Sequence, residues 1–301
     1  MTGVNFNLKG VFTALVTPFT QDGARVDYVA LEALVESQIA AGVDGLVPMG
    51  TTGECPTVSH EEHEKVIECV VRKAAGRVTV IGGTGSNNTT EALRLTAFAK
   101  KVGCDAALMV NPYYNKPNQE GLYQHFAKVC NEVGLPIVLY NIPGRTGITM
   151  APSTVARLYK DFPGKIVAIK EATGSLDIAT EIASLCDITI LSGDDSLTLP
   201  LISIGGSGVI SVVSNFGPQL IKDIVDNAFA GDYAKAAAAH RRVFKLIKLM
   251  FCEPNPQPCK AAMAMLGICS ATCRLPLCSV APETEARVRE MLPEFGFALK
   301  E

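Results

Sequence analysis

Residues 166–174 read IVAIKEATG, and this stretch decides which fold the sequence predicts. Its first four residues are apolar, which indicates a buried β-strand, and the strand then reaches Lys170. A parallel strand that is covered on both faces gives such a continuous apolar run. Because lysine is rarely fully buried without a partner, both the fold and the role of Lys170 need an explanation.

Seven further apolar runs are bounded by Gly, Pro, Asn or Asp: VFTALVTPF, GLVPMG, VTVIGGTG, ALMVNPYY, PIVLYNIPG, ITILSGDD and GVISVVSN. Amphipathic segments lie between the runs, and two of them begin with helix-start signals, Ser59 with Glu62 and Asn88 with Glu91. Eight strand and helix units over roughly 230 residues predict an α/β fold, a (β/α)8 TIM barrel.

An open doubly wound sheet is the competing architecture. The glycine-rich GTGSNN follows the third run, but no G-x-G-x-x-G follows the first strand, so the dinucleotide-binding fingerprint is missing. After GDYAKAAAAHRRVFKLIKLMF the pattern is helical only. We therefore predict a (β/α)8 barrel over residues 1–231 and a C-terminal helical domain over residues 232–301.

The composition is that of an ordinary globular protein, with 301 residues, 48% apolar side chains and a net charge of -3. Acidic and basic residues are interleaved, so no basic patch indicates a nucleic acid or a membrane surface as partner. The N-terminal MTGVNFNLKG lacks the basic and apolar regions of a signal peptide, and no 18-residue stretch is free of Gly, Pro and charge. We expect a soluble, cytoplasmic protein.

Metal binding is not predicted. His60 and His63 are three residues apart, whereas the ligands of an H-E-x-x-H zinc site are four apart, and the alternative is a solvated first turn of a helix. In a reducing compartment disulfides are not the default for the ten cysteines. Five cysteines crowd the C-terminal region without a C-x2-C pair that would indicate zinc: Cys252, Cys259, Cys269, Cys273 and Cys278.

In a barrel, the residues at the C-terminal ends of the strands converge on one mouth. An amine, phenols, hydroxyls and a guanidinium would gather there, a set that suits imine formation between a lysine and a carbonyl substrate. These side chains are Thr51 and Thr52 in GTTGE, Tyr113 and Tyr114 in NPYYN, Tyr140 and Arg145 in YNIPGRT, and Lys170.

Imine formation needs an amine that is neutral part of the time, and burial in an apolar strand lowers the pKa of a lysine. The alternative is that Lys170 forms an ion pair with a carboxylate. Glu171 is the less suited partner, since adjacent residues of a strand point to opposite faces. The other two carboxylates in reach along the chain are Asp194 and Asp195.

The other candidates also have structural alternatives. Tyr140 is either a proton relay or a packed barrel aromatic. Thr51 and Thr52 lie in a turn whose amides suit a carboxylate, but their hydroxyls would also suit a cap for the next helix. Arg145 follows Pro-Gly in a loop, where it either binds a carboxylate or is solvated.

The ordered motifs resemble the dihydrodipicolinate synthase and N-acetylneuraminate lyase group of Schiff-base, class I aldolases. The resemblance covers nearly the whole chain, through GTTGE, NPYYNKPNQEGLYQHF, YNIPGRTG, IKEATG, LSGDD, GVISV, NPQPCKAAMAMLG and RLPL. GTTGE and the arginine of PGRT look like the synthase branch, because the lyases usually carry a serine in the first motif.

This resemblance implies the condensation of pyruvate with L-aspartate-β-semialdehyde to 4-hydroxy-tetrahydrodipicolinate, on the route to diaminopimelate and lysine, without a cofactor. Lys170 would form the imine with pyruvate, and the resulting enamine would add to the aldehyde. Thr51 and Thr52 would bind the pyruvate carboxylate, and Arg145 would bind the semialdehyde carboxylate. Tyr140 would relay protons through Thr51 to Tyr114 of a neighbouring subunit. Gly193 and Ile210 would line the pyruvate pocket.

The resemblance also implies a homotetramer and inhibition by lysine at a subunit interface. A carboxylate at Glu91 suits a bound ammonium group. Cys55 and Pro56 depart from lysine-sensitive relatives, which often have small polar residues or alanine there, so the strength of inhibition stays open. The residues that match the lysine site are His60, His63, Asn87, Glu91 and Tyr113.

Three other functions stay open. A pyruvate-dependent aldolase of the same group would act on a sugar acid; activity with aspartate semialdehyde that is lost in Arg145→Ala separates it from the synthase. A sensor without catalysis would give no borohydride-trapped pyruvate adduct on Lys170. A phosphosugar enzyme would use GGSG at residues 205–208 as a phosphate cradle.

Overall fold

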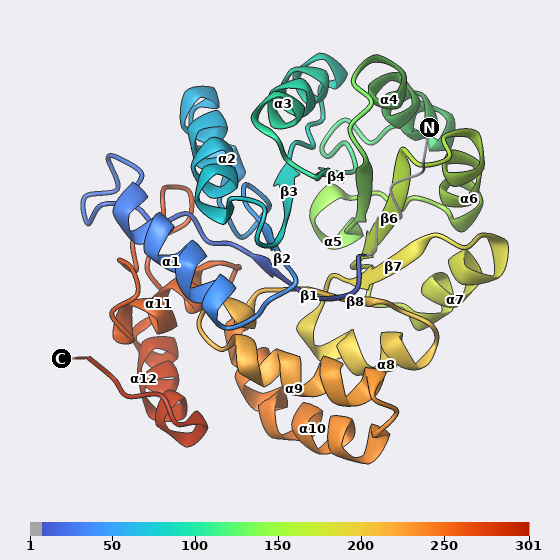
Figure 1. Ribbon diagram of the computed structural model, residues 1–301. Helices are drawn as coiled ribbons and strands as arrows, with labels where there is room; N and C mark the ends of the chain where they lie inside the picture. The colour runs from blue at the N-terminus through green and yellow to red at the C-terminus, as the bar shows by residue number, and fades with distance from the viewer. Residues whose placement is uncertain (1–7, 301) are drawn as a thin grey trace.

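The computed structural model describes residues 8–300, in which eight parallel strands close into a barrel in sequence order. The strands gather at the centre of Figure 1. Pairing of Gly10 with Gly208 joins the last strand to the first, so the TIM barrel is confirmed and the open doubly wound sheet is excluded. The strands are β1 (Gly10–Ala14), β2 (Gly45–Val47), β3 (Thr79–Gly83), β4 (Ala106–Val110), β5 (Ile137–Asn141), β6 (Ile166–Glu171), β7 (Thr189–Ser192) and β8 (Gly208–Ser211).

Helices surround the strands as an outer ring (Figure 1). No helix of the described part of the chain is long and apolar enough to cross a membrane. The first seven residues of MTGVNFNLKG, where no signal peptide is predicted, lie outside the described residues. The ring consists of α1 (Tyr28–Ala40), α2 (His60–Ala74), α3 (Thr89–Val102), α4 (Gln119–Glu132), α6 (Pro152–Asp161), α7 (Leu176–Leu185), α8 (Thr198–Ser203) and α9 (Pro218–Phe229), with short turns η1 (Cys55–Thr57), α5 (Pro143–Thr146), η2 (Asp195–Leu197) and η3 (Val213–Asn215) in its loops.

Side chains of each strand alternate between two apolar cores. In β6, Ala168 faces the barrel interior together with Tyr140 and Ile210, whereas Ile169 belongs to the core between the strands and the helices. A strand that is buried on both faces gains free energy from apolar residues at every position. This explains why the runs show little alternation and why each was recognisable in the sequence.

The two predicted helix starts differ in their outcome. Ser59 caps α2 and forms the predicted capping box with Glu62. Asn88 caps α3, but the backbone N–H of Asn88 donates to the Ser86 hydroxyl at 3.0 Å instead of to Glu91. Glu91 itself contacts Ser86, and its Oε1 lies 3.1 Å from His60 Nε2. The Glu91 carboxylate is therefore linked to the Asn88 cap through Ser86 and not by a direct hydrogen bond.

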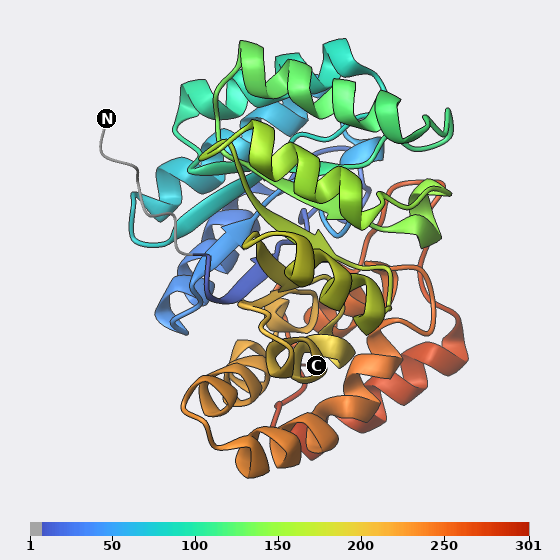
Figure 2. The same cartoon turned by 90° about the vertical axis from the view of Figure 1, so that its right-hand side faces the viewer.

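Helices α10 (Tyr233–Met250), α11 (Gln257–Met265) and α12 (Pro282–Met291) and the turn η4 (Leu292–Phe295) follow the barrel. Helix α10 packs against α9 and α8, and Figure 2 shows the orange and red helices together at one end of the molecule, away from α3 and α4. The C-terminal helical extension is thus confirmed, while the domain boundary between residues 231 and 232 stays a prediction.

The GGSG loop does not lie at the mouth of the barrel. Residues 205–208 lead into β8, so they lie at the N-terminal ends of the strands. A Cβ on Gly208 would come within 2.0 Å of the Gly10 carbonyl oxygen, so this glycine serves close packing of two strands. The structure therefore gives no support to the phosphate-cradle alternative, because barrel phosphate sites lie at the opposite end.

Candidate active site

Lys170 lies near the end of β6 on the inner face of the barrel, and only 5% of it is exposed. Tyr140 is its register partner on β5, and Lys170 Nζ lies 4.3 Å from the centroid of the Tyr140 ring. Tyr140 is also buried. The barrel thus brings the predicted imine-forming lysine and the predicted proton relay into direct contact.

The three carboxylates that were considered as partners of Lys170 are engaged elsewhere. Glu171 accepts the backbone N–H of Thr173 at 2.6 Å. Asp194 Oδ1 accepts the backbone N–H of Ser196 at 2.8 Å, and Asp195 Oδ2 accepts the N–H of Val212 at 2.9 Å. Among residues 8–300 no carboxylate forms an ion pair with Lys170. The structural alternative for this lysine, a stable ion pair, is wrong.

Gly193 lies beside Lys170, and Ile210 lies in the same interior cluster as Tyr140. A Cβ on Gly193 would lie 3.1 Å from Lys170 Cε and 2.5 Å from the Cβ of Ala172. Only glycine leaves this space beside the lysine open. Ile210, 1% exposed, belongs to the same interior cluster as Tyr140.

A buried polar network lies at the C-terminal ends of β4, β5 and β6. Asn141 Nδ2 donates to Glu171 Oε2 at 3.2 Å, and Asn141 Oδ1 accepts from Asn111 Nδ2 at 3.1 Å and from the Met150 N–H at 2.9 Å. Burial raises the pKa of Glu171. The network joins the ends of β4, β5 and β6 to Met150, which follows the turn that carries Arg145. No role in such a network was predicted for these residues, although Asn141 and Glu171 lie in the YNIPGRTG and IKEATG motifs.

Thr51 and Thr52 lie in the turn after β2, at the same end of the barrel as Lys170. Thr52 is buried, and its hydroxyl accepts a hydrogen bond from Asn255 Nδ2 at 2.9 Å. Neither hydroxyl caps the next helix, because η1 has no side-chain cap and α2 is capped by Ser59. The helix-capping alternative is therefore wrong.

The same turn is anchored to the C-terminal extension by a buried ion pair. Glu54, in the left-handed conformation at φ 55°, lies 2.5 Å from Lys260 Nζ on α11, and both side chains are fully buried. The other Glu54 oxygen accepts the backbone N–H of Arg274 at 2.9 Å, and the Arg274 guanidinium binds Glu62. The sequence signal was present, since Lys260 and Arg274 lie in the extension motifs, but their roles were not predicted.

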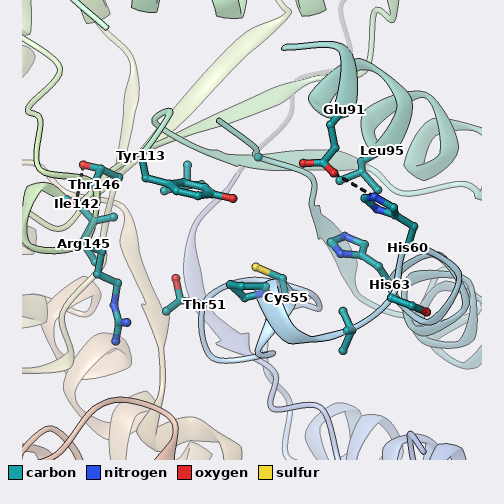
Figure 3. A pocket seen from close by; sticks show the side chains of 15 residues that line it. Thr51, Cys55, His60, His63, Glu91, Leu95, Tyr113, Ile142, Arg145 and Thr146 are labelled. Atoms are coloured by element: carbon teal, nitrogen blue, oxygen red, sulfur yellow. Dashed lines mark hydrogen bonds and ion pairs between the residues drawn. The ribbon is translucent and has the colours of Figure 1, made fainter. Parts of the chain in front are cut away.

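Arg145 lies in the one-turn helix α5 and not in the irregular loop that the sequence predicted. Pro143 starts this turn, with its φ already suited to a helix. Arg145 Nη2 donates to the Asn255 carbonyl oxygen at 3.3 Å. Figure 3 shows Arg145 and Thr51 on the same side of a cavity, across from His60 and Glu91.

This cavity of about 650 Å³ connects part of the predicted substrate site with most of the predicted lysine site. Its volume falls within the usual range for small-molecule pockets. Cys55 and Pro56 also line it, and Figure 3 places Cys55 between Thr51 and His63. The predicted residues among its lining are Thr51, Arg145, His60, His63, Glu91 and Tyr113.

Desolvation shifts the pKa of two residues of the predicted lysine site, the buried His63 and the half-buried Tyr113. His63 is buried, and its Nε2 lies 2.8 Å from the Gly83 carbonyl oxygen, so a solvated first turn is the wrong description for this histidine. Burial lowers the pKa of His63, which keeps the imidazole neutral at pH 7. Burial raises the pKa of Tyr113. Asn87 does not line the cavity, and its carbonyl oxygen accepts from Asn115 Nδ2 at 2.8 Å.

Tyr114 does not join the mouth of its own barrel. Its side chain is 90% exposed, and its backbone adopts a left-handed φ of 70°. A left-handed conformation is uncommon for a bulky residue. The loop after β4 therefore presents this tyrosine to the outside of the chain.

Fold and site together define a closed (β/α)8 barrel of the Schiff-base aldolase class, with a buried lysine on β6. The chain belongs to the Dihydrodipicolinate synthetase family, whose model matches residues 7–294. This confirms the resemblance that the motifs indicated. A relative from Endomicrobium trichonymphae, named 4-hydroxy-tetrahydrodipicolinate synthase, is 51% identical over 96% of this chain and 98% of its own. The crystal structure of dihydrodipicolinate synthase from Aquifex aeolicus is 47% identical, with a TM-score of 0.95 over 97% of this chain and 100% of its own.

Three other solved structures, each with a TM-score of 0.93, differ in ligand or assembly. The enzyme from Cyanidioschyzon merolae has lysine bound; it is 40% identical over 96% of this chain and 99% of its own. The chloride-inhibited enzyme from Acinetobacter baumannii is complexed with pyruvate; it is 41% identical over 96% of this chain and 99% of its own. A third structure is described as the first monomeric dihydrodipicolinate synthase variant; it is 40% identical over 96% of this chain and 97% of its own.

Proposed function

We propose that this protein condenses pyruvate with L-aspartate-β-semialdehyde to 4-hydroxy-tetrahydrodipicolinate through an imine on Lys170. The observation that carries the proposal is the buried Lys170, which contacts Tyr140, lies beside Gly193 and has no carboxylate partner among residues 8–300. Relatives about half identical over nearly the whole chain are named for this reaction.

In the first half of the reaction, the Lys170 amine adds to the ketone carbon of pyruvate, and loss of water gives the imine. Thr51 and Thr52 hold the pyruvate carboxylate, and the open space at Gly193 admits the substrate beside the lysine. Tyr140 donates the proton with which water leaves and accepts one as C3 loses a proton to form the enamine. No metal or organic cofactor is required for these steps.

In the second half, the enamine C3 attacks the aldehyde carbon of the semialdehyde, whose carboxylate binds Arg145. A guanidinium fork suits this carboxylate because it offers two parallel donors. The substrate amine then attacks the imine carbon, which closes the ring and releases the Lys170 amine. Protons leave through Tyr140 and Thr51 to Tyr114 of a neighbouring subunit.

The first prediction concerns Lys170→Ala. Turnover of pyruvate and L-aspartate-β-semialdehyde, coupled to a dihydrodipicolinate reductase and followed by nicotinamide oxidation, should fall by more than about a thousandfold because the nucleophile is lost. Borohydride with pyruvate should add mass to the wild type at Lys170 and leave the variant unlabelled. Lys160→Ala, an exposed lysine on α6, is the matched control.

Turnover in Lys170→Ala at the wild-type rate would contradict the proposal. A wild type that traps pyruvate but ignores the semialdehyde would instead favour a sugar-acid aldolase. A wild type that binds pyruvate without an adduct would favour the non-catalytic sensor.

The second prediction concerns inhibition by lysine at the cavity beside the mouth. The Glu91 carboxylate lines this cavity and is paired with His60, so it is placed to bind an ammonium group. Glu91→Gln should raise the half-inhibitory lysine concentration at least about tenfold, measured against the uninhibited rate of the same variant. Glu64→Gln, which removes a surface ion pair with Arg94, is the control.

A wild type that is not inhibited at millimolar lysine would contradict the regulatory proposal. The roles proposed for His63, Asn87 and Tyr113 rest on the same test, and the effect of Cys55 and Pro56 would appear in the inhibition constant.

We also propose a homo-oligomer, a tetramer, in the cytoplasm. The exposed Tyr114 supports a shared site, and the monomeric family member makes the assembly a matter for experiment.

A further inference from the structure

Asn255 connects the C-terminal extension to the mouth of the barrel. It lies between α10 and α11 and is only 6% exposed, although Cys252 three residues earlier is exposed. Its side chain and its backbone bind different partners. The side-chain Nδ2 donates to the Thr52 hydroxyl at 2.9 Å, and the backbone carbonyl accepts from Arg145 Nη2 at 3.3 Å.

The hydrogen bond from Asn255 determines what the Thr52 hydroxyl can do next. A hydroxyl carries one proton to donate and two lone pairs to accept. Because one lone pair is occupied by Asn255, the Thr52 proton is free to point elsewhere, and the hydroxyl donates to no other group within residues 8–300. A carboxylate accepts hydrogen bonds and donates none, so it is the substrate group that this orientation suits.

We infer that Asn255 is a positioning residue that aims the Thr52 proton at the pyruvate carboxylate. This inference rests on the proposed function and extends the substrate site to the C-terminal extension. The side chain acts on the pyruvate half of the site, and the backbone carbonyl steadies Arg145 on the semialdehyde half.

The choice of an amide fits this role. An aspartate at residue 255 would accept a hydrogen bond and would capture the Thr52 proton. In addition, Asn255 Oδ1 is buried without a hydrogen-bond partner among the described residues. An unpaired buried oxygen costs free energy, and a residue whose only task was to attach the extension would avoid that cost.

The experiment measures pyruvate binding and semialdehyde use separately. Borohydride trapping of the pyruvate imine over a range of pyruvate concentrations gives a half-saturation value for the wild type, Asn255→Ala and Asn255→Asp. The loss of one oriented hydrogen bond should raise this value about fivefold to tenfold in Asn255→Ala, and further in Asn255→Asp. The KM for the semialdehyde should change less than about twofold, because Arg145 binds a backbone carbonyl that both variants keep.

Two controls separate positioning from a structural role. Gln257→Ala removes a neighbouring, partly buried hydrogen bond of the extension, from Nε2 to the Cys278 carbonyl oxygen at 2.8 Å, and should leave pyruvate half-saturation near the wild-type value. Thr52→Val should raise it, and adding Asn255→Ala to Thr52→Val should have no further effect, since both act through one hydroxyl.

The inference is overturned if Asn255→Ala forms the imine with unchanged pyruvate half-saturation. It is also overturned if Asn255→Ala and Gln257→Ala raise both substrate constants together, because that result indicates a loosened extension. A folded wild type that traps no pyruvate would instead contradict the proposed function itself.

Discussion

Asp195 shows how one buried residue makes stability depend on pH. It follows β7, is 1% exposed, and its Oδ2 accepts the N–H of Val212, just beyond β8, at 2.9 Å. Burial raises the pKa of Asp195 from 3.8 to about 6. The native protein therefore binds this proton more tightly than the unfolded chain does. Its stabilising contribution is complete below pH 4 and is lost as the pH rises through about 6. As the pH rises, the wild type should lose about 3 kcal/mol or less of its free energy of unfolding through Asp195. Asp195→Asn, whose side chain is neutral at every pH, should not show this loss.

The measurement is the melting temperature from pH 4 to pH 7. As the pH rises, the melting temperature of the wild type should fall relative to that of Asp195→Asn. Asp187→Asn, at an exposed residue two positions before β7, is the control and should follow the wild-type curve. Parallel curves for wild type and Asp195→Asn would show that Asp195 does not titrate in this range.

Between elements, the turn after β2 and helix α11 are joined by the fully buried pair of Glu54 and Lys260. Removal of one partner leaves a buried charge unpaired, so Lys260→Met alone should destabilise the protein by about 3–5 kcal/mol, and Glu54→Gln alone should do so as well. The double variant should recover most of the loss, because the amide oxygen still accepts the Arg274 N–H and no charge remains buried. Denaturant unfolding of the four proteins gives the coupling energy.

The exposed pair of Lys128 and Glu132 on α4 is the control. Lys128→Met should change stability by less than about 1 kcal/mol, since solvent screens such pairs. Additive losses in the double variant would mean that Glu54 and Lys260 stabilise the protein independently. In that case the anchoring of the extension would have to come from apolar contacts.

For the whole molecule, the exposed Tyr114 raises the question of whether one chain suffices for activity. If Tyr114 completes the site of a neighbouring subunit, Lys170→Ala and Tyr114→Phe should each be strongly impaired alone. A mixed pair would hold one site with both Lys170 and Tyr114 intact. Co-refolding equal amounts should therefore restore about a quarter of the wild-type sites, as random pairing in a two-fold assembly predicts. No gain above the average of the two separate variants would indicate that each chain works alone.

The fold was predictable because its signals are local. An inward and an outward core make each strand apolar at nearly every position, and turn residues bound each run. The capping box of Ser59 and Glu62 lies within four residues and formed as expected. Asn88 and Glu91 show the same pattern with a different result, because the nearby Ser86 and His60 attract the carboxylate. A local pattern therefore predicts a helix start more reliably than it predicts the partner of each side chain.

By itself the sequence determined the barrel, the position of Lys170 at the C-terminal end of its strand, and membership of a family, since apolar runs and ordered motifs are read along the chain. Only the tertiary structure decided which side chains meet. Asn255 reaches Thr52 across 203 residues, and Lys260 reaches Glu54 across 206. These contacts form because the extension packs against the barrel and buries polar groups that must then find partners. That requirement depends on which surfaces touch, and no local pattern of residues encodes it.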